Sequence, residues 1–142
     1  MKTVLAALIM ACTFSVSAQE KKIKPTDLPM DALEFIATYY SKETVTVAKQ
    51  NTKDGNTSYE AVLTDKTEIE FTSEGSWREV DGKGKAIAAG FIPKPFMEYV
   101  QKNYPKQNIT KIDKRADEIE VDVENGKELI FSIHGKFVRE NK

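Results

Sequence analysis

Apolar residues recur every three or four positions in two stretches of the chain, at 28–42 and 92–105. This spacing predicts an amphipathic α-helix in each stretch. Both helices start beside a proline, Pro29 and Pro93, which suits a first helical turn because its missing N–H is not needed there. The residues expected on the buried side are Ala32, Phe35, Ile36, Tyr39, Phe96, Tyr99, Val100 and Tyr104.

Four short segments with alternating apolar and polar residues follow each predicted helix, a pattern typical of half-buried strands. In the first half they span 44–50, 57–64, 67–72 and 76–80, and in the second 109–114, 118–124, 128–133 and 136–139. The stretch "EIEFTSEGSW" at 68–77 returns as "ELIFSIHGKF" at 128–137, with Phe, Gly and an aromatic residue at matching places. We therefore predict two copies of one unit, joined by the glycine-rich segment 81–90.

These elements predict an α+β fold, a tandem α-β4 repeat with units at 27–80 and 91–140. Its two helices would pack on one face of an antiparallel sheet of about eight strands. Alternation along the strands assigns side chains to the two faces of this sheet. The residues expected to cover the helices are Tyr59, Ala61, Leu63, Ile69, Phe71, Trp77, Ile119, Val121, Val123, Leu129, Phe131, Ile133 and Phe137.

Side chains at the other set of alternating strand positions point to the opposite side of the sheet, which we call the open face. The sequence predicts that this face is acidic and has a few apolar centres. Apolar centres surrounded by charge suit a protein partner. A plain solvated sheet face, where charges prevent edge-to-edge association, is the alternative. The candidate partner-binding residues are Glu60, Val62, Glu68, Glu70, Arg78, Glu120, Asp122, Glu128 and Ile130.

The N-terminus has the features of a secretory signal peptide at 1–18: Lys2, a short apolar run, and small residues before a cut after Ala18. The run is too short to span a bilayer, so no membrane span is predicted. Acylation of Cys12 as a lipoprotein is the second interpretation. We expect 19–26 to be a flexible leader and 27–142 to form one domain.

Charge and candidate chemistry exclude several functions. Removal of the signal leaves 20 basic and 22 acidic residues, a net charge of −2, without the basic stripe that nucleic-acid binding requires. The single cysteine leaves with the signal, and His134 is the only histidine, expected in an exposed turn. No catalytic nucleophile or base is apparent, so the sequence predicts a protein that is not an enzyme and has no cofactor. Carboxylates two positions apart on one strand, as in Glu120 and Asp122, leave calcium binding open.

The chain resembles the β-lactamase-inhibitor-like, PepSY-like family of small secreted bacterial proteins. The resemblance rests on "LP" before the first helix (28–29), "YEAVL" (59–63), "EIEF" (68–71) and "GSWREV" (75–80). It implies a periplasmic location, a tandem α-β4 fold and no established activity. We expect a monomeric protein-binding module that inhibits or regulates an envelope protein through the open face. The alternative is a periplasmic protein that binds a small ligand or calcium, and self-association through the terminal strands is a third hypothesis.

Overall fold

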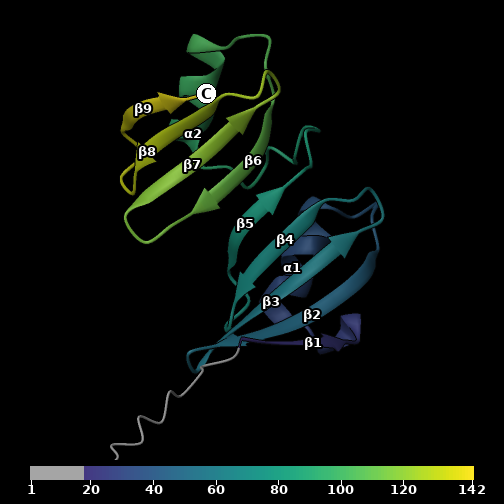
Figure 1. Ribbon diagram of the computed structural model, residues 1–142. Helices are drawn as coiled ribbons and strands as arrows, with labels where there is room; N and C mark the ends of the chain where they lie inside the picture. Colours follow the sequence, from purple (N-terminus) through teal and green to yellow (C-terminus); the bar gives the residue numbers. More distant parts are fainter. Residues whose placement is uncertain (1–17) are drawn as a thin grey trace, which may run out of the picture.

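The computed structural model describes residues 18–142, which form two helices and one open sheet of nine strands. Every strand pairs antiparallel with its neighbours in chain order, from β1 at one edge to β9 at the other (Figure 1). The α+β fold is therefore confirmed, with nine strands rather than about eight. The strands are β1 (Gln19–Ile23), β2 (Val45–Lys53), β3 (Asn56–Leu63), β4 (Glu68–Thr72), β5 (Trp77–Asp81), β6 (Ile109–Lys114), β7 (Glu118–Val123), β8 (Glu128–Ser132) and β9 (Phe137–Asn141).

Both helices lie on the same face of this sheet, as Figure 1 shows and as the sequence predicts. Helix α1 (Met30–Tyr39) covers the first half, and α2 (Lys94–Asn103) covers the second. Each begins directly after the predicted proline, Pro29 or Pro93. Trp77 and Phe137 pack against the core on the helix side, so the face assignment for both aromatic residues is confirmed.

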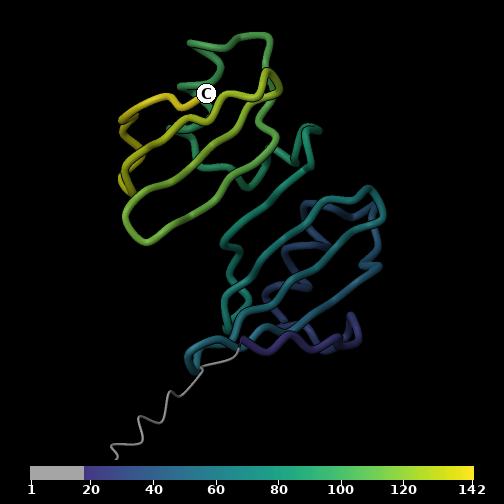
Figure 2. The backbone as a smooth tube through the Cα atoms, in the orientation of Figure 1, coloured from purple at the N-terminus to yellow at the C-terminus, as the bar shows by residue number. Residues whose placement is uncertain are grey.

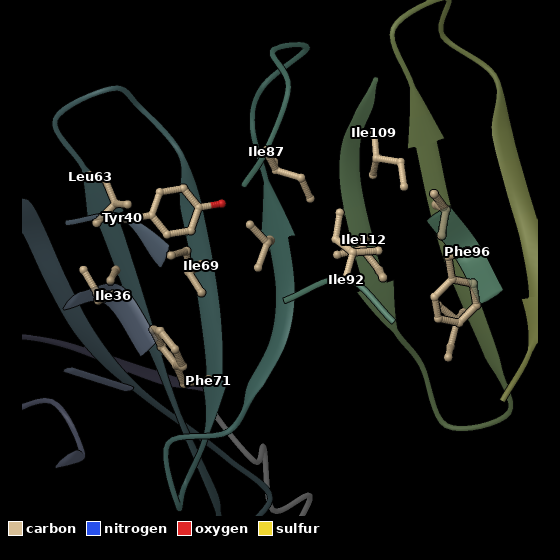
Figure 3. Packing of buried hydrophobic residues seen from close by; sticks show 14 of the residues in the cluster. Ile36, Tyr40, Leu63, Ile69, Phe71, Ile87, Ile92, Phe96, Ile109 and Ile112 are labelled. Atoms are coloured by element: carbon tan, nitrogen blue, oxygen red, sulfur yellow. The ribbon is translucent and has the colours of Figure 1, made fainter. Parts of the chain in front are cut away.

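The two halves share one hydrophobic core, to which the segment between β5 and α2 (82–93) contributes. Ile87 and Ile92 belong to this segment, and both are 7% exposed. In Figure 3 they lie between the first-half cluster around Phe71 and the second-half cluster around Phe96. Burial of these isoleucines contributes about 2 kcal/mol each to the free energy of unfolding, which favours a single folding unit.

The two halves also join through the sheet, where β5 pairs with β6. Figure 2 shows these strands side by side between the two halves. Only three residue pairs are in register here: Glu79 with Asp113, Val80 with Ile112, and Asp81 with Lys111. Strands β2 and β3, by comparison, pair along their whole lengths. The connection between the halves therefore depends strongly on side-chain contacts at β5 and β6.

The glycines that recur in the two copies allow each β-hairpin to approach the start of a helix. Gly75 has a φ of +94°, and a Cβ atom there would lie 2.8 Å from the Cβ of Pro29. Gly135 has a φ of +83°, and its Cβ would lie 3.0 Å from the Cβ of Pro95. Only glycine combines this backbone conformation with such close packing, which explains why the motif is repeated.

The expectation of a flexible leader at 19–26 is wrong. Gln19–Ile23 forms β1, which pairs with Ala48 to Thr52 of β2, and Pro25–Asp27 forms a short 3-10 helix. Ile23 packs against the hydrophobic core on the helix side. Hydrogen bonding to an edge strand orders this polar segment, although its composition resembles that of a mobile linker. The predicted signal at 1–18 and Cys12 lie outside the described residues, apart from Ala18.

Candidate functional site

The open face is the sheet surface opposite the helices, and a β-bulge in β5 determines which charges meet at its centre. Glu70 pairs with Glu79 and Phe71 with Trp77, so Arg78 is an extra residue in β5. The bulge keeps Trp77 on the helix side while both Arg78 and Glu79 contribute to the open face. Arg78 forms an ion pair with Glu70, lies 3.5 Å from Glu79, and donates to Asp113 at 2.9 Å.

A second cluster of ion pairs surrounds Arg115, which follows β6. Its guanidinium reaches Asp113 at 3.1 Å, Glu118 at 3.4 Å, and also Glu120. Lys111 joins the two clusters, since its Nζ lies 3.4 Å from Glu120 and 3.9 Å from Glu79. Ion pairs therefore run across the middle of the open face from β4 to β7.

Two of these carboxylates are almost completely shielded from water, although no helix covers this face. The side chain of Asp113 is 8% exposed and that of Glu120 is 5% exposed. Arg78 and Arg115 pair with Asp113, and Lys111 and Arg115 pair with Glu120. A buried carboxylate is destabilising unless it is paired, so these charges hold one another in place rather than facing solvent.

Ile130 does not have the exposed position that the sequence predicts. Its relative exposure is 0%, although it lies on the open face and is absent from the core between sheet and helices. In register, its neighbours are Glu120 on β7 and Arg139 on β9. Ile130 is therefore shielded from water between charged neighbours, and it cannot contact a partner directly. Alternation along the strand assigned Ile130 to the open face but could not show that neighbouring side chains shield it from water.

The first-half candidates lie nearer to solvent. Glu60 is 3.8 Å from Lys49, and Glu68 is 2.7 Å from Lys83. Val62 is half-buried and lies beside Val47 in the sheet register. This part of the open face combines a small apolar centre with paired charges, as expected for a surface that could receive another protein.

Three predicted candidates, Glu120, Asp122 and Glu128, come together on β7 and β8. One oxygen from each carboxylate lies within 4.8 Å of the others. The Oδ1 atom of Asp122 is buried and has no hydrogen-bond partner among the described residues. Burial, followed by repulsion from Glu120, raises the pKa of Asp122 to about 6. Glu120 is paired with Lys111 and Arg115, so the negative charge of this cluster is compensated only in part.

The structure thus brings the nine candidates onto one face but changes its character. Except at the Asp122 cluster, the predicted acidic surface is a network of compensated charges. The sequence interpretation missed Glu79, Lys111, Asp113 and Arg115, which complete this network. Lys111 and Asp113 flank the buried Ile112, so strict alternation along β6 could have assigned both to the open face. Arg115 follows the strand and could not be assigned in that way.

A family model described as "Putative beta-lactamase-inhibitor-like, PepSY-like" matches residues 57–139. The chain belongs to this PepSY-like family. It also matches a solved structure from Bacteroides thetaiotaomicron, a "putative calcium-regulated periplasmic protein", with 31% identity and a TM-score of 0.82. That match covers 87% of this chain and 97% of the other. No match exists among curated proteins.

Two solved structures from Bacteroides vulgatus, both described as putative periplasmic proteins, share the same PepSY-like fold. One is 30% identical with a TM-score of 0.83, covering 87% of this chain and 97% of the other. The second is 31% identical with a TM-score of 0.80, covering 89% and 100% respectively. In residues 18–142, neither helix is long and apolar enough to cross a membrane. These relatives support the resemblance seen in the sequence.

Proposed function

We propose that this PepSY-like protein is a non-enzymatic periplasmic module that binds another protein through the open face. The observation that carries the proposal is the network of fixed, mixed charges on a sheet surface that neither helix covers. Because Arg78, Asp113 and Arg115 hold one another in place, docking a partner immobilises few additional side chains. Pre-organisation of this kind lowers the entropic cost of association.

The chemistry of the face suggests the character of the partner. Because the acidic groups are already paired, a strongly basic partner would add little binding free energy. We therefore expect a partner with mixed polar loops and a small apolar anchor. Val62 and Val47 offer the matching apolar contact on the half-buried first part of the face. The partner would be an envelope protein that this module inhibits or regulates, with the module acting as a monomer.

Substitution of Val62 tests this proposal. Val62→Arg places a bulky charge on the open face, whereas Glu34→Lys changes an exposed position of α1 on the opposite side. We expect affinity purification from envelope extract to recover a partner with the wild type and with Glu34→Lys, but not with Val62→Arg. Equal recovery by all three proteins, with unchanged melting temperatures, would show that the open face is not the docking surface.

A second candidate function is calcium binding at Glu120, Asp122 and Glu128, which the unpartnered Oδ1 of Asp122 favours. Calcium prefers carboxylate oxygens and would balance the charge of Asp122, whose pKa is raised first by burial and then by repulsion from Glu120. A structural relative is described as calcium-regulated, which adds support. Calorimetry should detect calcium binding to the wild type and none to Asp122→Asn, while magnesium serves as the control ion. A wild type without a calorimetric response would remove this candidate.

A further inference from the structure

On the helix side of the molecule, an apolar hollow of about 310 Å³ lies where α2 begins. It lies away from the open face, so it is independent of the proposed docking surface. Ile133, predicted to be buried on the helix side, instead follows the end of β8 and is 53% exposed. The lining residues are Pro93, Pro95, Phe96, Lys114, Ile119, Ile133, His134 and Gly135.

Lys114 introduces a positive charge into this apolar surrounding. Its Nζ lies 3.6 Å from the centre of the Trp77 ring, a cation–π contact that fixes the side chain. No ion pair or hydrogen bond links its ammonium group to another residue within 18–142. Burial lowers the pKa of Lys114, whereas hydrogen bonds to Glu20 and Glu68 raise the pKa of Lys49 and Lys83. Lys114 thus lacks the carboxylate that compensates these other lysines.

The beginning of α2 adds only a small positive contribution, because Pro95 has no N–H group and the N–H of Phe96 donates to the carbonyl oxygen of Pro93. Backbone N–H groups at the start of a helix carry partial positive charge and favour an anion. The first turn of α1 contains Asp31, which compensates this charge, but the first turn of α2 contains no acidic residue. Pro93, Pro95 and Phe96 from this end of α2 line the hollow. The helix end and Lys114 therefore border the same space.

The first half of the molecule lacks this arrangement, although the two halves repeat the same fold. Lys114 lies opposite Ile119 at the end of β6, and the equivalent register position in β2 is Gln50, opposite Tyr59. The duplication has kept the backbone but placed a cation in the second copy only. The repeated unit itself therefore does not require a lysine here, and the contact of Lys114 with Trp77 of β5 is specific to the junction between the halves.

From these observations we propose that the hollow binds a small apolar monocarboxylate, with its carboxylate at Lys114 and its hydrocarbon part against Ile119 and Ile133. The volume of the hollow lies at the lower end of the range for small-molecule sites. A ligand with an apolar chain of moderate length and one negative charge matches both the lining and the uncompensated cation. This site would operate whether or not the open face binds a protein.

Octanoate is a suitable probe, used with the 19–142 protein at concentrations far below micelle formation. Two-dimensional amide NMR should show saturable shifts at Phe96, Ile133, His134 and Gly135. Lys114→Met keeps the length and packing of the side chain but removes its charge. Loss of one charge-assisted hydrogen bond should weaken octanoate binding roughly ten- to hundredfold. Octanol, which has no carboxylate, should bind the wild type as weakly as octanoate binds the variant.

Lys106→Met is the matched control, because Lys106 is exposed in the turn after α2 and lies outside the hollow. It should bind octanoate like the wild type. Ile133→Ser should weaken binding through the apolar contact while leaving the fold intact, since Ile133 is largely exposed. Absence of octanoate binding to the wild type would overturn the proposal, as would equal affinity for wild type and Lys114→Met. Shifts confined to the open face would also refute it.

Discussion

Arg78 on β5 donates a hydrogen bond to Asp113 on β6 over 2.9 Å, and this contact joins the two repeated halves across their narrowest connection. The Asp113 side chain is 8% exposed, while that of Arg78 is 38% exposed. Arg115 holds the second oxygen of Asp113 at 3.1 Å. The carboxylate is therefore held by one arginine from each half of the sheet.

Removal of Arg78 should weaken this connection. Arg78→Met leaves a nearly buried Asp113 with only Arg115 as a cationic partner, and we expect a loss of about 1–3 kcal/mol in the free energy of unfolding. Urea denaturation measures this change. Lys94→Met, which removes the exposed pair with Glu98, is the control and should change stability by less than about 0.5 kcal/mol. Similar effects of both substitutions would mean that the Arg78 contact is not a stabilising link.

Truncation of Ile130 should lower stability as truncation of a core residue does, because Ile130 is buried although it lies on the open face. Ile130→Ala removes a fully buried side chain and should lower the free energy of unfolding by about 2–4 kcal/mol. Val138→Ala changes a side chain that is 55% exposed and should cost less than about 0.5 kcal/mol. If Ile130→Ala were as stable as the wild type, Ile130 would instead be the exposed contact that the sequence suggests.

Replacement of glycine by alanine should lower the free energy of unfolding by different amounts in the turns at Gly55 and Gly75. Gly55→Ala meets no atom within 4 Å and pays only for its φ of +76°, about 1 kcal/mol. Gly75→Ala also places a methyl group 2.8 Å from Pro29 and 2.9 Å from the nitrogen of Ala32, which should cost about 1–3 kcal/mol more. Thermal denaturation of the two variants compares these costs. Equal destabilisation would argue against close packing between this hairpin and α1.

Stability should depend on pH through Asp122, whose pKa is raised from 3.8 to about 6 by burial and then by Glu120. The folded protein holds this proton more tightly than the unfolded chain. Its contribution to stability is therefore complete below pH 3.8 and is lost as the pH rises through about 6. Asp122→Asn removes the penalty, so it should stabilise the calcium-free protein by about 1–2 kcal/mol at pH 7.5. Denaturation at several pH values tests whether this gain declines towards pH 4.5; a gain independent of pH would contradict the assignment.

Much of the architecture follows from local patterns. Helical spacing around Ile36 and Val100 and alternation around Phe71 and Phe131 predict which side of each element is buried, because burial of large apolar groups dominates folding. The repeated glycine at 75 and 135 likewise indicates two equivalent turns. The β1 strand could not be predicted in this way, since "QEKKI" is polar and becomes ordered only by pairing with β2.

The candidate face shows where sequence reasoning reaches its limit. Alternation along the strands correctly assigned Glu120 and Ile130 to the same side of the sheet. It gave no information about which side chains cover them. Their burial results from Arg115, Lys111 and neighbouring strands, which are brought together when β6 pairs with β7 and β7 with β8. Whether a carboxylate is free or compensated depends on distances of a few ångströms between residues far apart in the chain.

The sequence by itself determined the duplication and the side of most strands that faces a helix, because these depend on the order and periodicity of neighbouring residues, while its short motifs indicated the family. Only the tertiary structure decided that the open face is a network of paired charges, that the Oδ1 atom of Asp122 has no hydrogen-bond partner within residues 18–142, and that Lys114 borders an apolar hollow. Electrostatic energy depends on separation in space and on exclusion of water, and neither quantity can be read from positions along a chain.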